Sequence, residues 1–259
     1  MTILEKIAAH THERVEAAKS VCPADKIKSL ALSMPKGNFE FEAAVRNSTD
    51  IAFICECKKA SPSKGVIAEE FPYLQIAREY EAAGADCISV LTEPEWFMGS
   101  DEYLREIAQN VSVPCLRKDF TVDEYMIYEA KLLGAKAVLL ICSILSPEEI
   151  KTYIKVCDML GISALVEAHD EIEIRTAVSS GARIIGVNNR NLGDFSVDTD
   201  NSRRLIELVP DDILFVSESG VRTADDIALL RKAGADAVLI GETLMRAHDK
   251  SKKLAELKG

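Results

Sequence analysis

The sequence lacks any long apolar segment. Its longest uninterrupted apolar run covers residues 137–142, far short of the ~20 residues that a membrane-spanning helix needs. The first 19 residues are charged throughout and contain no apolar core of the signal-peptide type. These absences predict a chain without a membrane partner or export signal, for which the cytoplasm is the expected location.

Basic residues are also scarce. Lysine and arginine number 31 against 42 aspartates and glutamates, a net charge of −11, whereas nucleic-acid binders usually carry a basic excess. No nucleic-acid partner is therefore expected. The seven cysteines are an odd number, which favours reduced thiols in a cytoplasm over a disulfide framework. With 47% apolar and 28% charged residues, the composition is that of a globular protein rather than a disordered one.

What the sequence does contain is an internal repeat of roughly 50 residues. Each copy shows a helix end, a glycine cap and a short apolar strand, with the glycines at Gly84, Gly134, Gly181 and Gly234. Four more apolar strands fall between or before these copies. The eight strand-containing segments are residues 51–57, 83–91, 113–118, 133–141, 162–167, 180–188, 213–218 and 233–241.

Segments with helical periodicity separate the strands, including residues 71–83, 122–133, 147–160, 170–179 and 224–233. Alternating strands and helices imply right-handed parallel crossovers, and eight such units match a closed (β/α)8 barrel. The alternative is an open doubly wound sheet, but the repeat shows no point at which the strand order reverses. The fold class predicted is therefore an α/β (β/α)8 barrel.

The first 50 residues do not fit the repeat. Helices are expected over residues 2–20 and 23–33, the second starting near Pro23. We interpret residues 1–50 as an N-terminal helical extension packed on the barrel. Because no Gly/Ser linker or low-complexity stretch separates the extension from the rest, a single domain is expected over residues 1–259.

Polar side chains occur where the predicted strands end, which is where a (β/α)8 barrel carries its active site. Strand alternation places Glu56 and Lys58 on one face, so that Cys55 and Cys57 point at the helices as small apolar side chains. Six groups are expected to converge on the barrel mouth: Glu56, Lys58, Lys118, Glu167, Asn188 and Glu218. Lysines and carboxylates in buried contact shift one another's pKa and suit proton transfer.

Histidine contributes little to this prediction. His10, His12 and His248 fall on surface-like helices and His169 follows the fifth predicted strand, so each is expected to be structural or solvated. A Cys-x-Cys pair without a nearby histidine is poor evidence for zinc. No metal site is predicted.

The loops after the last two predicted strands favour an anion site. They contain Gly220 and Gly241, where the backbone can approach a phosphate. The alternative is that these are ordinary turn glycines. Arg190 and Ser61 could add charge-assisted and hydroxyl contacts. A cationic mouth on an acidic protein would attract a small anionic substrate.

Seven segments extend these observations to nearly the whole chain. They are residues 56–65 (ECKKASPSKG), 91–100 (LTEPEWFMGS), 116–130 (LRKDFTVDEYMIYEA), 165–171 (LVEAHDE), 185–198 (IGVNNRNLGDFSVD), 216–227 (VSESGVRTADDI) and 238–245 (VLIGETLM). In this order and spacing they resemble the indole-3-glycerol phosphate synthases, the barrel lyases of tryptophan biosynthesis. KKASPSKG, LRKDF and NNRNL are specific together, whereas the SESG and IGE types recur in other phosphate-binding barrels. The N-terminal extension is also similar to that of this family.

The resemblance implies the substrate 1-(2-carboxyphenylamino)-1-deoxyribulose 5-phosphate, an anionic sugar phosphate. It implies closure of the indole ring with loss of CO2 and water, and no metal or organic cofactor. Lys118 would be the general acid of ring closure, Lys58 would hold the substrate carboxylate, and Glu167 would be the base of dehydration. Which lysine is the acid of dehydration stays open.

The resemblance also assigns binding roles. Glu56, Asn188 and Glu218 would hold the lysines and the sugar hydroxyls. Phosphate and ribulose contacts are implied for Ser61, Arg190, Ser219, Gly220, Gly241 and Glu242, and apolar walls for the anthranilate ring are implied for Phe97 and Phe120. The sequence departs from the family pattern at Trp96 and Met98 and at Cys55, Cys57, Cys115 and Cys142, none of which removes a catalytic group.

Two other functions are alternatives to the synthase activity. Another phosphate-binding barrel enzyme, such as phosphoribosylanthranilate isomerase, would use an Asp/Cys acid–base pair, and Cys57 is expected to point away from the mouth. A non-catalytic barrel that binds a sugar phosphate or a protein would not need Lys58, Lys118 and Glu167 together. The sequence identifies no partner among enzymes of the same pathway.

Overall fold

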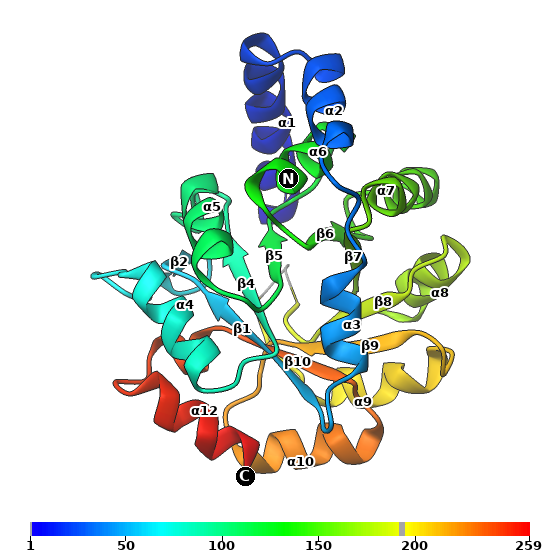
Figure 1. The fold of residues 1–259 in the computed structure, drawn as a ribbon. Coiled ribbons are helices and arrows are strands. Elements are labelled where there is room, and N and C mark those ends of the chain that lie inside the picture. Colours follow the sequence, from blue (N-terminus) through cyan, green and yellow to red (C-terminus); the bar gives the residue numbers. More distant parts are fainter. Residues whose placement is uncertain (1, 192–194) are drawn as a thin grey trace.

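A computed structural model describes residues 2–191 and 195–259 of the chain. Within them, eight parallel strands close into a barrel in the order β1-β10-β9-β8-β7-β6-β5-β4, which confirms the predicted (β/α)8 class (Figure 1). The barrel strands are β1 (Ala52–Cys57), β4 (Cys87–Leu91), β5 (Cys115–Lys118), β6 (Ala137–Ile141), β7 (Ser163–Ala168), β8 (Ile184–Asn188), β9 (Leu214–Glu218) and β10 (Ala237–Ile240).

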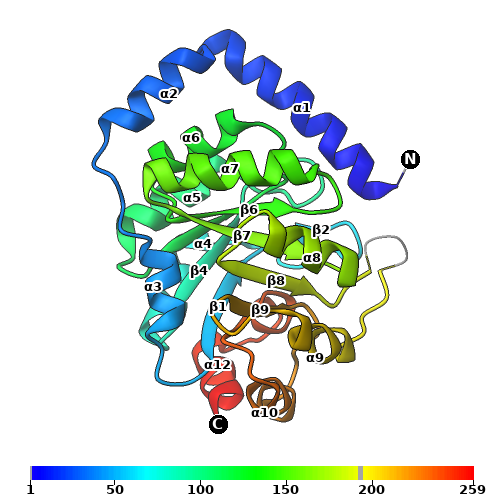
Figure 2. The same ribbon diagram turned by 90° about the vertical axis from the view of Figure 1, so that its right-hand side faces the viewer.

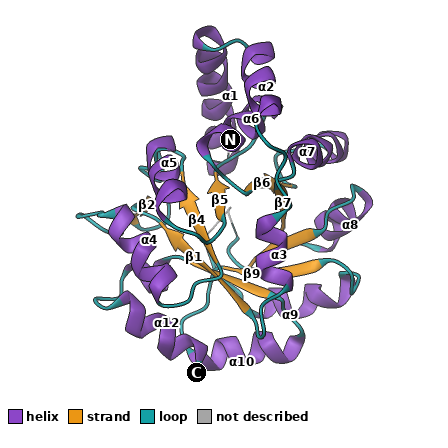
Figure 3. Ribbon diagram, in the orientation of Figure 1, coloured by secondary structure: helices purple, strands orange, loops and turns teal. Residues whose placement is uncertain are grey.

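Helices follow the strands and form the outer layer, as the colouring by secondary structure shows (Figure 3). They are α4 (Tyr73–Ala82), α5 (Asp101–Asn110), α6 (Glu124–Leu133), α7 (Pro147–Leu160), α8 (Glu171–Ser179), α9 (Asp200–Leu205) with a 3-10 turn (Ile206–Leu208), α10 (Ala224–Ala233), α11 (Glu242–Met245) and α12 (Lys250–Lys258). Of the helices in the described ranges, none has the length and apolar composition needed to cross a bilayer.

Local sequence explains where the helices begin and end. The helix α7 starts at a capping box, in which Ser146 and Glu149 satisfy each other's backbone N–H groups. The helices α6 and α10 end at Gly134 and Gly234, each with φ of 93°. This left-handed conformation favours glycine, which is why the repeat carries a glycine at the helix end.

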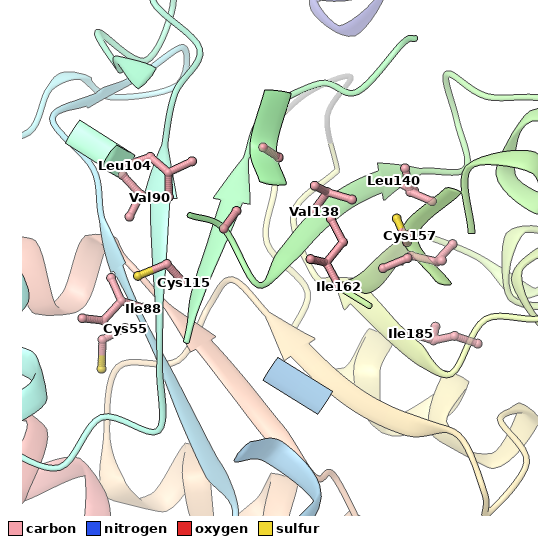
Figure 4. Packing of buried hydrophobic residues seen from close by; sticks show 14 of the residues in the cluster. Cys55, Ile88, Val90, Leu104, Cys115, Val138, Leu140, Cys157, Ile162 and Ile185 are labelled. Carbon is pink, nitrogen blue, oxygen red and sulfur yellow. The ribbon is translucent and has the colours of Figure 1, made fainter. Parts of the chain in front are cut away.

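The core has two layers. Inside the barrel, side chains such as Ile54, Leu116 and Leu165 pack against one another. Between the barrel and the helices lies a larger cluster that includes Cys55, Cys57 and Cys115, and part of it is drawn in Figure 4. The alternation prediction for Cys55 and Cys57 is therefore confirmed. Burial raises the pKa of both thiols, so they remain neutral packing groups.

The N-terminal extension comprises α1 (Ile3–Val21), α2 (Ala24–Ser33) and α3 (Glu40–Arg46). Figure 2 shows α3 at the end of the barrel opposite to the start of α1. There Phe41 and Val45 of α3 join the interior cluster and close that end of the barrel. Arg14 and Lys19 of α1 form ion pairs of 2.7 Å with Asp119 and Asp123, so α1 is fixed to the loop that follows β5.

No residue ranges were predicted for α5, α9, α11 and α12, although strand–helix alternation implies helices after the strands. Two further features were not predicted at all. One is α3, whose seven residues are too few for a clear periodic signal. The other is a small antiparallel pair, β2 (Ala60–Ser61) with β3 (Gly65–Val66), in the loop after β1. This pairing folds the loop into a hairpin beside the barrel mouth.

Candidate active site

The carboxyl ends of the barrel strands surround a cavity of about 400 Å³. All fourteen predicted site residues line it: Glu56, Lys58, Ser61, Phe97, Lys118, Phe120, Glu167, Asn188, Arg190, Glu218, Ser219, Gly220, Gly241 and Glu242. The sequence motif over residues 185–198 includes residues 192–194, which lie outside the described residues.

The centre of the cavity holds one lysine between two glutamates. Lys118 Nζ, at the end of β5, lies 3.2 Å from Glu167 Oε2 on β7 and 3.3 Å from Glu218 Oε2 on β9. The glutamate side chains are 2% exposed and that of Lys118 is 14% exposed. Two acceptors are thus brought to one cation at a place that is nearly closed to water.

This arrangement sets the protonation of all three groups. Burial lowers the pKa of Lys118, but the charges of Glu218 and Glu167 raise it more, so the ammonium form is strongly favoured. Burial raises the pKa of Glu167, yet Lys118 and His169 bring it below its usual value. For Glu218, burial outweighs the attraction of Lys118, and its pKa rises to about 7.

A second lysine–carboxylate pair lies on β1 and in the loop after it. Lys58 Nζ is 2.6 Å from Glu56 Oε1, and Ser89 Oγ donates to the other oxygen of Glu56 at 3.4 Å. Gly241, at the end of β10, leaves room for this pair. A Cβ there would overlap Glu56 Oε1 and come within 2.9 Å of Lys58 Nζ. Its φ of −114° needs no glycine, so the requirement is one of space.

Cationic side chains gather around Glu242, the residue after Gly241. Glu242 Oε2 lies 3.7 Å from an Arg190 nitrogen, and Glu242 Oε1 lies 3.9 Å from Lys64 and 3.0 Å from Arg246. The Glu242 carboxylate therefore holds three cations near the turn of Ser219 and Gly220. Arg246 lines the cavity, whereas Lys64 reaches Glu242 from the loop after β1. Neither was predicted as a site residue, although Lys64 belongs to the KKASPSKG motif.

An apolar wall completes the cavity. The rings of Phe97 and Phe120 lie 5.8 Å apart between centroids. Ile3, Leu4 and Ile7 of α1 also line the cavity. Sequence reasoning missed these three, because the periodicity of a helix shows that it has an apolar face but not which distant surface that face covers.

His169, which was expected to be structural or solvated, does not line the cavity but lies beside the site residue Glu167. Its Nε2 lies 3.5 Å from Glu167 Oε1 and its Nδ1 lies 3.0 Å from Glu173 Oε2. The signal was present in the sequence, because residues two apart near a strand end share a face. This is the same rule that pairs Glu56 with Lys58. Over residues 2–191 and 195–259, no group of three or more His, Cys, Asp or Glu side chains could hold a metal ion.

Comparison with known proteins agrees with this geometry. The family model for indole-3-glycerol phosphate synthase matches residues 4–257. The chain is 59% identical over 258 residues to the indole-3-glycerol phosphate synthase of Ruminiclostridium cellulolyticum, with 99% of each chain covered. It is 52% identical over 256 residues to the enzyme of that name from Endomicrobium trichonymphae, again with 99% of each covered.

Solved structures with low sequence identity share the fold. Thiamine phosphate pyrophosphorylase from Pyrococcus furiosus is 17% identical with a TM-score of 0.62, over 84% of this chain and 96% of that one. A 3-hexulose-6-phosphate synthase is 14% identical with a TM-score of 0.63, over 80% and 98%. These two show the barrel alone. The match along almost the entire sequence shows that the chain belongs to the indole-3-glycerol phosphate synthase family.

Proposed function

We propose that this protein converts 1-(2-carboxyphenylamino)-1-deoxyribulose 5-phosphate to indole-3-glycerol phosphate, CO2 and water, in tryptophan biosynthesis. The observation that carries the proposal is the buried Lys118, held between Glu167 and Glu218 in a cavity that also contains the Lys58–Glu56 pair. This arrangement offers proton donors and acceptors next to an apolar wall and a cationic rim. Lys118 corresponds to the ketone of the substrate and Lys58 to its carboxylate. The apolar wall corresponds to the aromatic ring, and the cationic rim to the phosphate.

Ring closure needs an acid. The aromatic carbon that bears the carboxylate bonds to the ketone carbon, and the carbonyl electron pair moves to oxygen, which takes a proton. Lys118 is the donor we assign, because its two glutamate partners keep it as an ammonium group before the reaction. The low solvent exposure of Lys118 and its two partners favours direct proton transfer to the substrate over exchange with water.

Decarboxylation follows when the carboxylate leaves as CO2 and its bonding electrons return to the ring. Lys58 would hold this carboxylate by charge pairing until it leaves, with its ammonium group oriented by Glu56 at 2.6 Å. Dehydration then removes a proton from the new ring and expels the hydroxyl group as water. Glu167 is the base we assign, since its lowered pKa keeps it ionised. Either lysine could supply the proton to the hydroxyl group.

The phosphate end of the substrate is assigned to Arg190, Ser61 and the turns at Gly220 and Gly241. Gly220 has a φ of 92°, and a Cβ there would meet Thr199 at 2.6 Å. The turn thus needs glycine for both conformation and space. Phe97 and Phe120 would face the anthranilate ring.

Replacing Arg190 by alanine should raise KM by roughly 10- to 100-fold and change kcat less, because a charged hydrogen bond to phosphate stabilises ground state and transition state alike. Steady-state kinetics of Arg190→Ala measure this split. Arg175→Ala, at an exposed position on α8, is the matched control and should behave as the unaltered protein. A loss confined to kcat would contradict the phosphate role.

Replacing Gly241 by alanine should lower kcat/KM by roughly 10-fold or more, because the new methyl group occupies the space of the Glu56–Lys58 pair. Alanine tolerates the negative φ at Gly241, so any fall in the midpoint of thermal unfolding reports displacement of the buried Glu56–Lys58 pair rather than backbone strain. Kinetics and thermal unfolding of the same preparation separate these effects. Unchanged kinetics would show that the pair need not hold its observed geometry.

A substrate comparison tests the proposed function. The protein is given the carboxyphenylamino-deoxyribulose phosphate in one reaction and phosphoribosylanthranilate in another. The products are separated by chromatography and identified by NMR, because an isomerase product has the same mass as its substrate. We expect conversion of the first and none of the second. The isomerase alternative requires the reverse, and it is disfavoured because Cys57 packs in the outer layer, away from the cavity.

We further infer that residues 1–259 fold as one domain that works in the cytoplasm on this small phosphate-bearing substrate. The ion pairs of Arg14 and Lys19 with the loop after β5, and the packing of α3 into the barrel end, support one domain. The seven cysteines, all within the described residues and all free thiols, support a reducing location.

A further inference from the structure

His169 connects the cavity to a second carboxylate outside it. It follows β7 directly, and its ring lies between Glu167, at the end of that strand, and Glu173 on α8. Glu173 Oε2 accepts from the backbone N–H of His169 at 2.7 Å and lies 3.0 Å from Nδ1. One carboxylate oxygen thus fixes both the main chain and the ring of His169.

The opposite ring nitrogen is directed at Glu167. His169 Nε2 is buried and has no hydrogen-bond partner among the described residues, while Glu167 Oε1 lies 3.5 Å away. That separation is longer than the roughly 2.7–2.9 Å of a charge-assisted hydrogen bond. Contacts of this kind often shorten when substrate binds. Because Nδ1 already faces a carboxylate, a protonated ring would present N–H groups to both glutamates.

We propose that His169 is a positioning residue for Glu167, which holds one carboxylate oxygen through Nε2 while Lys118 holds the other. The inference rests on the proposed function, since it gives a role to a neighbour of the assigned base. Lys118 contacts Glu167 Oε2 and His169 faces Oε1, so the carboxylate is restrained from two sides. A base fixed in this way keeps one orientation toward the substrate.

Charge supports the same assignment. Burial lowers the pKa of His169, but Glu173 and Glu167 raise it more, so its net pKa lies above the usual value. The imidazolium form in turn helps Lys118 to lower the pKa of Glu167. The titratable groups that act on His169 are Glu167 on β7, Glu173 on α8 and Glu218 on β9.

Other polar groups also lie around the ring. Ser143 Oγ lies 3.4 Å from Nδ1, and Asn201 donates to the backbone oxygen of His169. Asp170, Asp198 and Arg190 line the same recess as His169. Of the groups in contact with the ring nitrogens, only Glu167 and Glu173 are charged.

The test compares His169→Gln and His169→Leu with the unaltered protein. Glutamine can place a neutral amide near the position of Nε2, whereas leucine cannot donate. We expect kcat to fall roughly 10-fold in the glutamine variant and roughly 100-fold in the leucine variant, with KM nearly unchanged. His248→Gln, at an exposed position, is the control and should change neither constant.

A second measurement does not depend on turnover. The side-chain carboxyls of glutamate are labelled with 13C, the Glu167 resonance is identified from its loss in Glu167→Gln, and its titration is followed by NMR. Removing the imidazolium charge should raise the pKa of Glu167 and move the acidic limb of the kcat–pH profile to higher pH. A histidine that only supports the fold would lower kcat without moving either titration.

An unchanged Glu167 titration in His169→Leu would overturn the inference, as would a shifted titration with unchanged kcat. If the unaltered protein does not turn over the substrate, the proposed function fails, and the NMR titration still decides whether His169 acts on Glu167.

Discussion

Replacing Lys118 by methionine is expected to lower kcat by roughly 10³- to 10⁴-fold. The methionine side chain is similar in length, but it can neither donate a proton nor balance the charges of Glu167 and Glu218, which lie 3.2 and 3.3 Å from the Lys118 ammonium group. Ring closure would then lack its acid. Steady-state turnover and binding of a substrate analogue, measured on one preparation, separate loss of chemistry from loss of binding.

Lys118→Arg is the matched control for charge. Arginine keeps a positive charge near both glutamates, but its proton is held too tightly for donation at neutral pH. We therefore expect the arginine variant to recover stability toward guanidinium relative to the methionine variant, while its turnover remains low. Activity close to that of the unaltered protein in Lys118→Met would show that Lys118 is not the acid. Recovered activity in Lys118→Arg would show that Lys118 contributes only its positive charge and not a proton.

Replacing Glu167 by glutamine is expected to lower the rate of indole formation by roughly 10²- to 10⁴-fold. Glutamine fills the same space but cannot accept the proton that dehydration releases. Because CO2 leaves before water, a single turnover of Glu167→Gln should release CO2 faster than it forms indole. In the unaltered protein the two signals should rise together.

Glu218→Gln is the comparison for this experiment. Glu218 contacts Lys118 as Glu167 does. Its pKa of about 7 means that it is partly protonated at neutral pH, whereas Glu167 is ionised. Its loss should slow the reaction without separating CO2 release from indole formation. If Glu218→Gln separates the two signals as strongly as Glu167→Gln, the base is not specific to Glu167.

The barrel and the centre of its site were predictable because both depend on short-range rules. A repeat of strand, helix and glycine cap defines the (β/α)8 topology, and the topology brings the strand ends together. Alternation along each strand then decides which side chains face inward, as it did for Glu56 and Lys58 against Cys55 and Cys57. Neither step needs long-range information.

The remainder of the site depends on contacts between distant segments. Ile3 and Ile7 reach the cavity because contacts such as that of Arg14 with Asp119, more than 100 residues away along the chain, fix α1 to the barrel. The amphipathic pattern of α1 does not encode that partner. The ionic contacts of Glu242 with Lys64 and Arg190 similarly join α11 to the loops that follow β1 and β8. His169 was different, because strand alternation from Glu167 could have indicated its face, although no such prediction was made, and only its pairing with Glu173 required the structure.

The central claim, that one site closes the ring and removes CO2 and water, is tested most directly by one assay on the unaltered protein. The protein is mixed with the carboxyphenylamino-deoxyribulose phosphate in EDTA, and indole fluorescence and CO2 release are recorded together. We predict that both signals rise at the same rate and reach one equivalent each. Tight binding of a substrate analogue with no rise in either signal would contradict the assigned roles of Lys118, Lys58 and Glu167.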